Sequence, residues 1–325
     1  MNATGPWVDE VRIKDSIENG KQLRMTKGVH VVVDQSNFPL KQAVYFDTSD
    51  GRMVFAIPRN GKAYVGTTDT FYGENPKNPV ATREDVAYIL DAITFMFPSI
   101  QLSTQQVEST WAGVRPLIFE EGKDPSEISR KDEIWESASG LVTIAGGKLT
   151  GYRKMAEMVV DRVCENIKSS SSFGPSITKH LPLSGGAVGG SEGFKSFVEM
   201  KAIEGQQYGL TYDESRHLAG FYGANVNHLF AYANVLQNNS YGLPLPLAAK
   251  LAYAIQFEMT CTPADFFVRR TGDLYFNMDE VHAYKEQVCQ MMKVQLSYSE
   301  NQVDFYRFDL DKQVQEATSF REENA

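Results

Sequence analysis

The chain has 325 residues, of which 42% are hydrophobic and 22% charged, with a formal net charge of -9. This length and composition indicate a globular protein of about two domains, and the acidic balance argues against nucleic-acid binding, which needs a basic surface. No apolar run has the length of a membrane-spanning helix and no signal peptide is visible, so we expect a cytoplasmic protein that is soluble or at most peripheral to a membrane.

The first half of the chain predicts an antiparallel sheet. Asn60-Gly61 is a strong hairpin signal between two segments that each contain valine and an aromatic residue. Connections this short cannot provide the crossover that parallel strands need, so we expect antiparallel pairing. The expected strands, separated by Pro, Gly, Asn and Asp clusters, are residues 28–34, 43–48, 52–59, 62–69, 107–118, 133–137 and 141–146.

Two helices are expected among these strands. Thr82 followed by Asp85 resembles a capping box, the apolar residues after it recur at helical spacing, and Pro98 ends the run. A second apolar stripe predicts a helix over about 150–167, directly after the last expected strand.

The second half changes character after two breaks, which are rich in Ser and Gly. From there the start signals are helical throughout. Thr211 with Glu214, Pro246, and Thr262-Pro263 can each begin a helix, and 279–294 and 298–318 also have helical patterns. We therefore expect an all-α domain over the last third of the chain.

The segment TIAGGKLTGYRKMAE, residues 143–157, is the one most suggestive of a ligand site. It reads as an apolar strand, then Gly146, Gly147 and Lys148, then an amphipathic helix. A helix N-terminus offers unpaired N–H groups and a positive dipole end, glycines allow close approach of a ligand, and the lysine adds a full charge. The combination suits an anion or a polar ring, although a plain strand-to-helix turn would have the same pattern.

A phosphate-binding P-loop is excluded for this segment. That motif needs a glycine five residues before the last glycine and a Ser or Thr after the lysine. Val142 and Leu149 occupy these positions.

Two arginines are further candidates. Arg115 lies in an otherwise apolar strand, where a cation is costly unless it is paired or faces a ligand, and guanidinium groups suit carboxylates and phosphates. Arg130 follows a charged loop and, in isolation, reads as a solvated surface residue. His30 and Asp69 read as structural groups, and we assign them no catalysis.

The cysteines give no sign of a metal site. Cys164, Cys261 and Cys289 are far apart in the sequence and lack metal-ligand spacing. We expect reduced, structural cysteines and no bound metal.

Several long motifs resemble the FAD-dependent glycerol-3-phosphate dehydrogenases, and the aerobic bacterial enzymes most closely. They are spread over the whole chain. The motifs are NATGPW (2–7), KGVH (27–30), FAIPR (55–59), GTTDT (66–70), WAGVRPL (111–117), DPSEISRKDEIW (124–135), IAGGKLTGYRKMAE (144–157) and TPADFFVRRTG (262–272).

The resemblance implies an α+β fold: an antiparallel substrate-binding sheet with flanking helices, which includes a remnant of an FAD-binding domain, and then an all-α C-terminal domain. The family's Gly-x-Gly-x-x-Gly fingerprint is not found after a strand here, so we expect the chain to correspond to the C-terminal portion of the enzyme. The expected divisions are 1–23 (remnant of the FAD-binding domain), 24–168 (substrate domain), 169–193 (linker) and 194–325 (helical domain).

The resemblance also assigns site residues. Arg115 and Lys148 would be catalytic, and Arg115, Arg130 and Lys148 would bind glycerol 3-phosphate, while hydride passes from its C2 to the flavin and dihydroxyacetone phosphate forms. Without the pyrophosphate loop, we expect the isolated chain to bind FAD weakly and to be inactive. The residues implied to contact FAD are Asn2, Ala3, Thr4, Gly5, Gly146, Gly147, Lys148, Leu149 and Thr150.

The expected partners are a quinone acceptor and a second copy of the chain, with a possible position at the inner face of the plasma membrane. Two alternatives remain. One is a glycerophosphate oxidase, which would pass its electrons to oxygen. The other is a non-catalytic phosphate-binding or interaction module.

Overall fold

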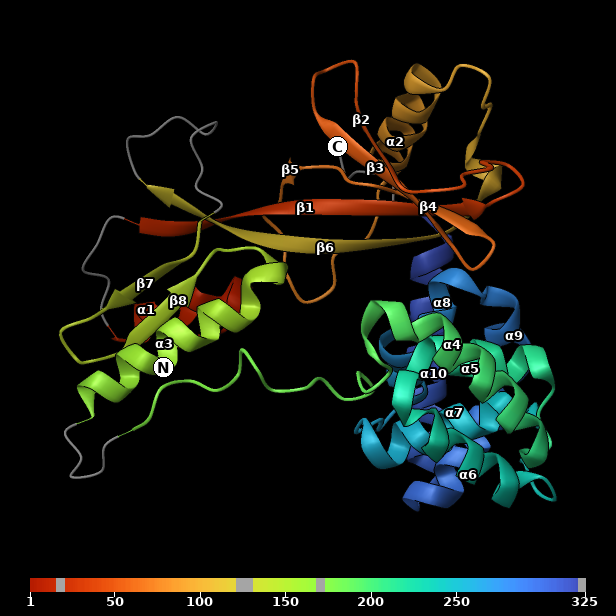
Figure 1. Ribbon diagram of the computed structural model, residues 1–325. Helices are drawn as coiled ribbons and strands as arrows, with labels where there is room; N and C mark the ends of the chain where they lie inside the picture. The colour runs from red at the N-terminus through yellow and green to blue at the C-terminus, as the bar shows by residue number, and fades with distance from the viewer. Residues whose placement is uncertain (16–20, 121–130, 168–172, 321–325) are drawn as a thin grey trace. The chain divides into compact units, whose positions relative to one another are not determined.

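The computed structural model describes residues 1–15, 21–120, 131–167 and 173–320, and it divides into two compact units (Figure 1). The first unit comprises residues 1–181 together with Phe320, and the second comprises residues 182–319. The chain therefore passes between the units at 181–182 and again at 319–320. No helix in the described ranges is both long and apolar enough to cross a bilayer.

An antiparallel sheet built around one long strand forms the centre of the first unit (Figure 1). This strand, β1 (Lys21–Asp34), pairs with β6 (Val107–Glu120) along one edge. β4 (Lys62–Gly66) and β5 (Thr70–Phe71) share its other edge. β3 (Met53–Arg59) pairs with β4, and β2 (Val44–Asp47) pairs with β3. The predicted antiparallel sheet is confirmed.

The hairpin predicted from Asn60-Gly61 is also present, with Arg59 opposite Lys62. Asn60 and Gly61 have φ values of 50° and 77°. Positive φ at both central residues is the conformation of the tight turn whose twist matches a β-hairpin. β1, by contrast, begins seven residues before the expected residue 28, because pairing with β6 extends it through a stretch in which polar and apolar residues alternate.

Helix α2 (Arg83–Met96) covers one face of this sheet (Figure 1). Its predicted capping box is present: the Thr82 hydroxyl accepts from the Asp85 amide, and the Asp85 carboxylate accepts from the Thr82 amide. Asp85 also forms a buried ion pair with Lys27 of β1, at 2.6 Å. The core between helix and sheet includes Val29, Val31, Val33, Phe46, Val54, Ala56, Val65, Val86, Ile89 and Ile93.

A second group of elements in the first unit lies beside the end of the β1–β6 ribbon at which β1 begins and β6 ends (Figure 1). The hairpin of β7 (Glu133–Glu136) and β8 (Val142–Ala145) gains a parallel bridge from Asn2, whose backbone exchanges hydrogen bonds with Val142 and Ile144. The helical segments here are η1 (Gly5–Trp7), α1 (Val8–Asp15), η4 (Leu149–Gly151) and α3 (Tyr152–Asn166), and η2 (Thr104–Gln106) precedes β6.

The second unit is all helical in its described residues, as the sequence predicts (Figure 1). Two buried clusters form its core, one centred on Leu251, Phe266 and Met291 and the other on Leu218 and Phe230. Its helices are α4 (Gly190–Gly205), η5 (Gln206–Tyr208), α5 (Tyr212–Tyr222), η6 (Gly223–Asn225), α6 (Val226–Leu236), α7 (Leu245–Phe257), η7 (Asp265–Arg270), α8 (Asp273–Phe276), α9 (Met278–Leu296) and α10 (Glu300–Thr318).

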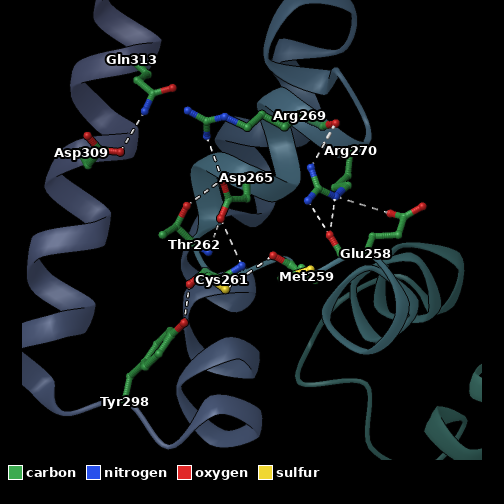
Figure 2. Close-up of polar contacts among 10 residues, drawn as sticks. All are labelled: Glu258, Met259, Cys261, Thr262, Asp265, Arg269, Arg270, Tyr298, Asp309 and Gln313. Carbon is green, nitrogen blue, oxygen red and sulfur yellow. Dashed lines mark hydrogen bonds and ion pairs between the residues drawn. The ribbon is translucent and has the colours of Figure 1, made fainter. Parts of the chain in front are cut away.

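The segment from Thr262 starts as expected and then widens into one stretch of π-helix, η7. Figure 2 shows the polar contacts around it. The Asp265 carboxylate accepts from the Thr262 amide and pairs with Arg269, each at 3.0 Å. Arg270 donates to the Glu258 carbonyl. These contacts are internal to the helical unit, so both arginines have a structural role there.

Candidate functional site

The turn between β8 and α3 requires glycine at two successive positions. Gly146 and Gly147 have φ values of 74° and 83°, a region that L-residues other than glycine rarely adopt. A Cβ on Gly146 would lie 2.3 Å from the Lys131 carbonyl oxygen, and one on Gly147 would lie 2.6 Å from the Met155 sulfur. The pair therefore forms a backbone cradle that no side chain can fill.

Helix α3 follows the short 3-10 helix η4, in which the Gly151 and Tyr152 amides donate to the Lys148 and Leu149 carbonyls. No side chain caps α3 at Gly151, and no acidic residue lies in its first turn. The positive dipole end of α3 is therefore not neutralised by an acidic side chain of its first turn and can act on a ligand. Lys148 is exposed at the start of this turn.

A cavity of about 380 Å³ lies against the turn and the first turns of α3. It contains six of the nine residues expected to contact a cofactor: Ala3, Gly5, Gly146, Gly147, Lys148 and Leu149. Its remaining lining residues are Met1, Pro116, Ile144, Ala145, Tyr152, Met155, Ala156, Val159 and Val160.

The other three expected cofactor residues are not among the cavity's lining. Asn2 is buried, its side-chain amide donates to the Val8 carbonyl, and its oxygen accepts from the Thr4 hydroxyl at 2.8 Å. Asn2 thus anchors the start of α1 and places Ala3 and Gly5 at the cavity. Thr150 is exposed within η4.

Arg115 lies on the face of β6 opposite to that of its neighbour Pro116, which lines the cavity. Its guanidinium donates to the Thr67 hydroxyl at 2.9 Å and to the Thr68 carbonyl at 3.2 Å, and it pairs with Asp69 at 3.3 Å. Gly28 on β1 leaves room for it, because a Cβ there would lie 2.4 Å from the Arg115 nitrogen. The side chain keeps 35% of its surface exposed, so it can still meet a ligand.

His30 accompanies Arg115 on this face and was not selected from the sequence. Its ring stacks on Trp111 with 4.7 Å between centroids, and Gly66 makes room for it. Burial first, and the nearby Arg115 charge second, lower the pKa of His30 to about 4. The imidazole is therefore neutral at physiological pH. The signal that could have revealed it is the cross-strand register, which places His30 opposite Trp111.

The structure brings the turn residues together around one cavity and places Arg115 on the adjoining strand, whereas Arg130 lies outside the described residues. No group of three or more potential metal ligands occurs in the described ranges.

The residues present suit a flavin. The cavity walls are mostly apolar, as a ring system needs. At one edge, the glycine cradle allows close approach, and the positive dipole end of α3 and Lys148 supply positive charge. This combination favours a planar ring that becomes negatively charged on reduction.

Two family models match the chain. Residues 1–153 match the FAD dependent oxidoreductase family, and residues 176–303 match the C-terminal domain of alpha-glycerophosphate oxidase. In sequence, as well as in its sheet, cradle and cavity, the chain is therefore similar to FAD-dependent oxidoreductases.

Similar proteins and one similar crystal structure indicate a particular enzyme within this class. The aerobic glycerol-3-phosphate dehydrogenase of Staphylococcus haemolyticus is 55% identical over 328 residues, which cover 100% of this chain and 59% of that relative. That of Staphylococcus aureus is 55% identical over 98% of the chain. The crystal structure of the glycerol-3-phosphate dehydrogenase from Bacillus halodurans complexed with FAD matches with a TM-score of 0.89 and 48% identity, covering 99% of this chain and 63% of that one.

The chain is similar over its whole length to aerobic glycerol-3-phosphate dehydrogenases, as its motifs predict, and it spans about 59% of the length of the first of these relatives. The predicted α+β class with a helical second half is confirmed.

Proposed function

We propose that this chain forms the substrate-binding and flavin-contacting part of an FAD-dependent dehydrogenase that oxidises sn-glycerol 3-phosphate to dihydroxyacetone phosphate. The observation that carries the proposal is the glycine cradle with Lys148 at the cavity edge, next to the strand that bears Arg115. Identity of 55% to aerobic glycerol-3-phosphate dehydrogenases supports the choice of substrate.

Each residue has a defined role in this proposal. Gly146, Gly147 and the N–H groups that follow hold the cofactor's polar edge, and Lys148 stabilises negative charge there. The bound FAD supplies the hydride acceptor. Arg115 and Arg130 bind the phosphate and oxygen groups of the substrate. His30, neutral beside Arg115, can exchange a hydrogen bond with a substrate hydroxyl without adding charge.

The proposal includes a quinone as electron acceptor, a peripheral position at the cytoplasmic face of the membrane, and a homodimer, all of which the family resemblance implies. An oxidase that uses oxygen is the second candidate, because the model matching residues 176–303 is named for alpha-glycerophosphate oxidase. Peroxide formation during turnover would identify the oxidase, and reduction of a quinone without peroxide would identify the dehydrogenase.

The first test is a visible absorption spectrum of the chain after incubation with FAD and desalting. We expect almost no retained flavin, because the family's pyrophosphate-binding fingerprint is not found in this sequence. After addition of the N-terminal part of the Bacillus halodurans relative, we expect retained flavin that glycerol 3-phosphate bleaches without air. Bleaching by the chain alone would overturn the expected inactivity, and retained flavin that never bleaches would overturn the proposed function.

A pair of lysine variants makes this test specific to the site. Lys148→Met should reduce flavin retention or slow the bleaching, because it removes the cation at the cavity edge. Lys179→Met changes an exposed lysine of the same unit that does not line the cavity, and it should behave like the unchanged chain.

A further inference from the structure

We propose that Arg24 and Thr26 of β1 complete, together with Arg115, the subsite that binds the phosphate group of a phosphomonoester substrate. The inference deepens the proposed function and rests on it. It is carried by two groups on the strand opposite Arg115: an arginine stacked on aromatic rings that has no counter-ion among the described residues, and a buried hydroxyl that has no hydrogen-bond partner among them.

Arg24 is held between two aromatic rings. Its guanidinium carbon lies 4.9 Å from the centroid of the Phe71 ring and 4.6 Å from that of Phe119. The side chain forms no hydrogen bond or ion pair with any residue in the described part of the chain. Stacking limits its rotamers while its N–H donors remain available at the ring edges, so little entropy is lost when an anion binds.

The strand register places Arg24 beside Arg115. Thr26 lies directly opposite Arg115 on β6 and opposite Phe71 on β5. Arg24 lies two residues earlier on β1, so its side chain is on the same face. Diagonal neighbours of this kind are about 7–8 Å apart across a sheet, but the Arg115 guanidinium lies over Gly28, on the side of Thr26 away from Arg24. The Arg115 side chain therefore has to turn towards Thr26 before both arginines can share one phosphate.

Thr26 occupies the position between the two arginines. It is 5% exposed, and its hydroxyl has no hydrogen-bond partner in the described residues. Burial of an unsatisfied hydroxyl is unfavourable. A phosphate oxygen drawn between Arg24 and Arg115 would provide the missing acceptor once the Arg115 side chain turns towards Thr26.

Charge balance explains why a second arginine is needed. Arg115 is already paired with Asp69, so these two residues together add no net positive charge. A phosphomonoester carries nearly two negative charges at neutral pH. Arg24, which has no carboxylate partner in the described ranges, supplies the excess positive charge on this face.

The experiment is a calorimetric titration of the whole chain with glycerol 3-phosphate, inorganic phosphate and glycerol. Arg24→Gln should weaken binding of both phosphates about tenfold, as expected for loss of one charge-assisted contact, and Arg24→Lys should restore part of it. Thr26→Val should weaken binding several-fold without lowering stability. Glycerol should show no difference among the variants.

Arg52→Gln is the matched control, because Arg52 also lies over an aromatic ring, that of Tyr88 at 5.7 Å, but belongs to another part of the sheet. Arg115→Gln distinguishes a failure of the Arg24 inference from a failure of the proposed substrate site. If it weakens binding and Arg24→Gln does not, the Arg24 inference is wrong and the proposed substrate site stands. If the unchanged chain binds no phosphate at all, the subsite is overturned, whereas the flavin spectrum still decides the proposed function.

Discussion

The surroundings of His30 disfavour the protonated, positively charged form of its ring. Its ring stacks on Trp111, most of it is buried, and the Arg115 guanidinium is close enough to oppose its protonation. The pKa of His30 is accordingly lowered to about 4, from 6.5 for an ordinary histidine. A neutral imidazole is thereby maintained beside a permanently charged arginine, which suits a face that must receive an anion.

This lowered pKa predicts how stability depends on pH. The unfolded chain takes up a proton at His30 near pH 6.5, whereas the folded chain does so only near pH 4. The contribution of neutral His30 to the stability of the folded chain is therefore fully present above about pH 6.5 and is lost as the pH falls towards 4. The free energy of unfolding of the first unit should fall by about 3 kcal/mol over this range because of His30 alone. Urea titrations followed by tryptophan fluorescence would measure it.

The control is His180→Gln, which changes an exposed histidine of the same unit. This variant should keep the pH dependence, and His30→Phe should flatten it between pH 6.5 and 4.5. An equal slope in His30→Phe and the unchanged chain would show that His30 titrates normally in the folded state.

At the scale of elements, α2 is joined to the sheet by one buried ion pair. Lys27 of β1 and Asp85 of α2 are 2.6 Å apart, and their side chains are 9% and 4% exposed. Asp85 also serves the capping box of α2. A single carboxylate thus fixes both the start of the helix and its attachment to the central strand.

Asp85→Asn should be strongly destabilising for this reason. Asparagine can still accept the capping hydrogen bond, but Lys27 is left as a buried charge without its partner, which costs about 3–5 kcal/mol. Denaturation followed by tryptophan fluorescence would measure the loss. Asp91→Asn, an exposed position on the same helix, should change stability by less than about 0.5 kcal/mol.

The double variant Lys27→Met with Asp85→Asn tests the cause. It should recover much of the loss, because a neutral pair of similar size has no uncompensated charge. If the double variant is as unstable as Asp85→Asn alone, then the cost comes from the cap or from packing.

Local signals explain which elements the sequence predicts well. The hairpin at Asn60-Gly61 and the capping boxes at Thr82 and Thr211 depend on residues within four positions of one another, and all three are present. Helix α1 was not predicted, because it has few apolar residues and depends on distant contacts. Its Arg12 is buried and stacks over Trp135, 4.4 Å from the ring centroid.

The residues of the site also fall into those that local sequence signals predict and those that depend on distant contacts. The glycine turn was predicted because its conformational demand is local to Gly146 and Gly147. The roles of Arg24, Thr26 and His30 depend on a register with β6, more than 80 residues later in the chain. A shift of one residue would move all three to the other face, and nothing in their own segment fixes that register.

At the scale of the whole molecule, the two units can be followed by different spectroscopic signals. All three tryptophans, Trp7, Trp111 and Trp135, belong to the first unit. The second unit is helical and contains none, so circular dichroism follows both units and tryptophan fluorescence follows only the first. Each unit has hydrophobic core clusters of its own.

Because each unit has its own core, we expect two thermal transitions by circular dichroism, of which only one coincides with the change in tryptophan fluorescence. Cleavage by a protease within 173–181, where Phe173, Ile177 and Leu181 are each more than half exposed, should leave the fluorescence midpoint within about 2 °C of the uncut value. The helical unit, residues 182–319, should keep its own transition by circular dichroism after the cut. A single transition seen equally by both probes, or loss of both after the cut, would show that the units unfold as one.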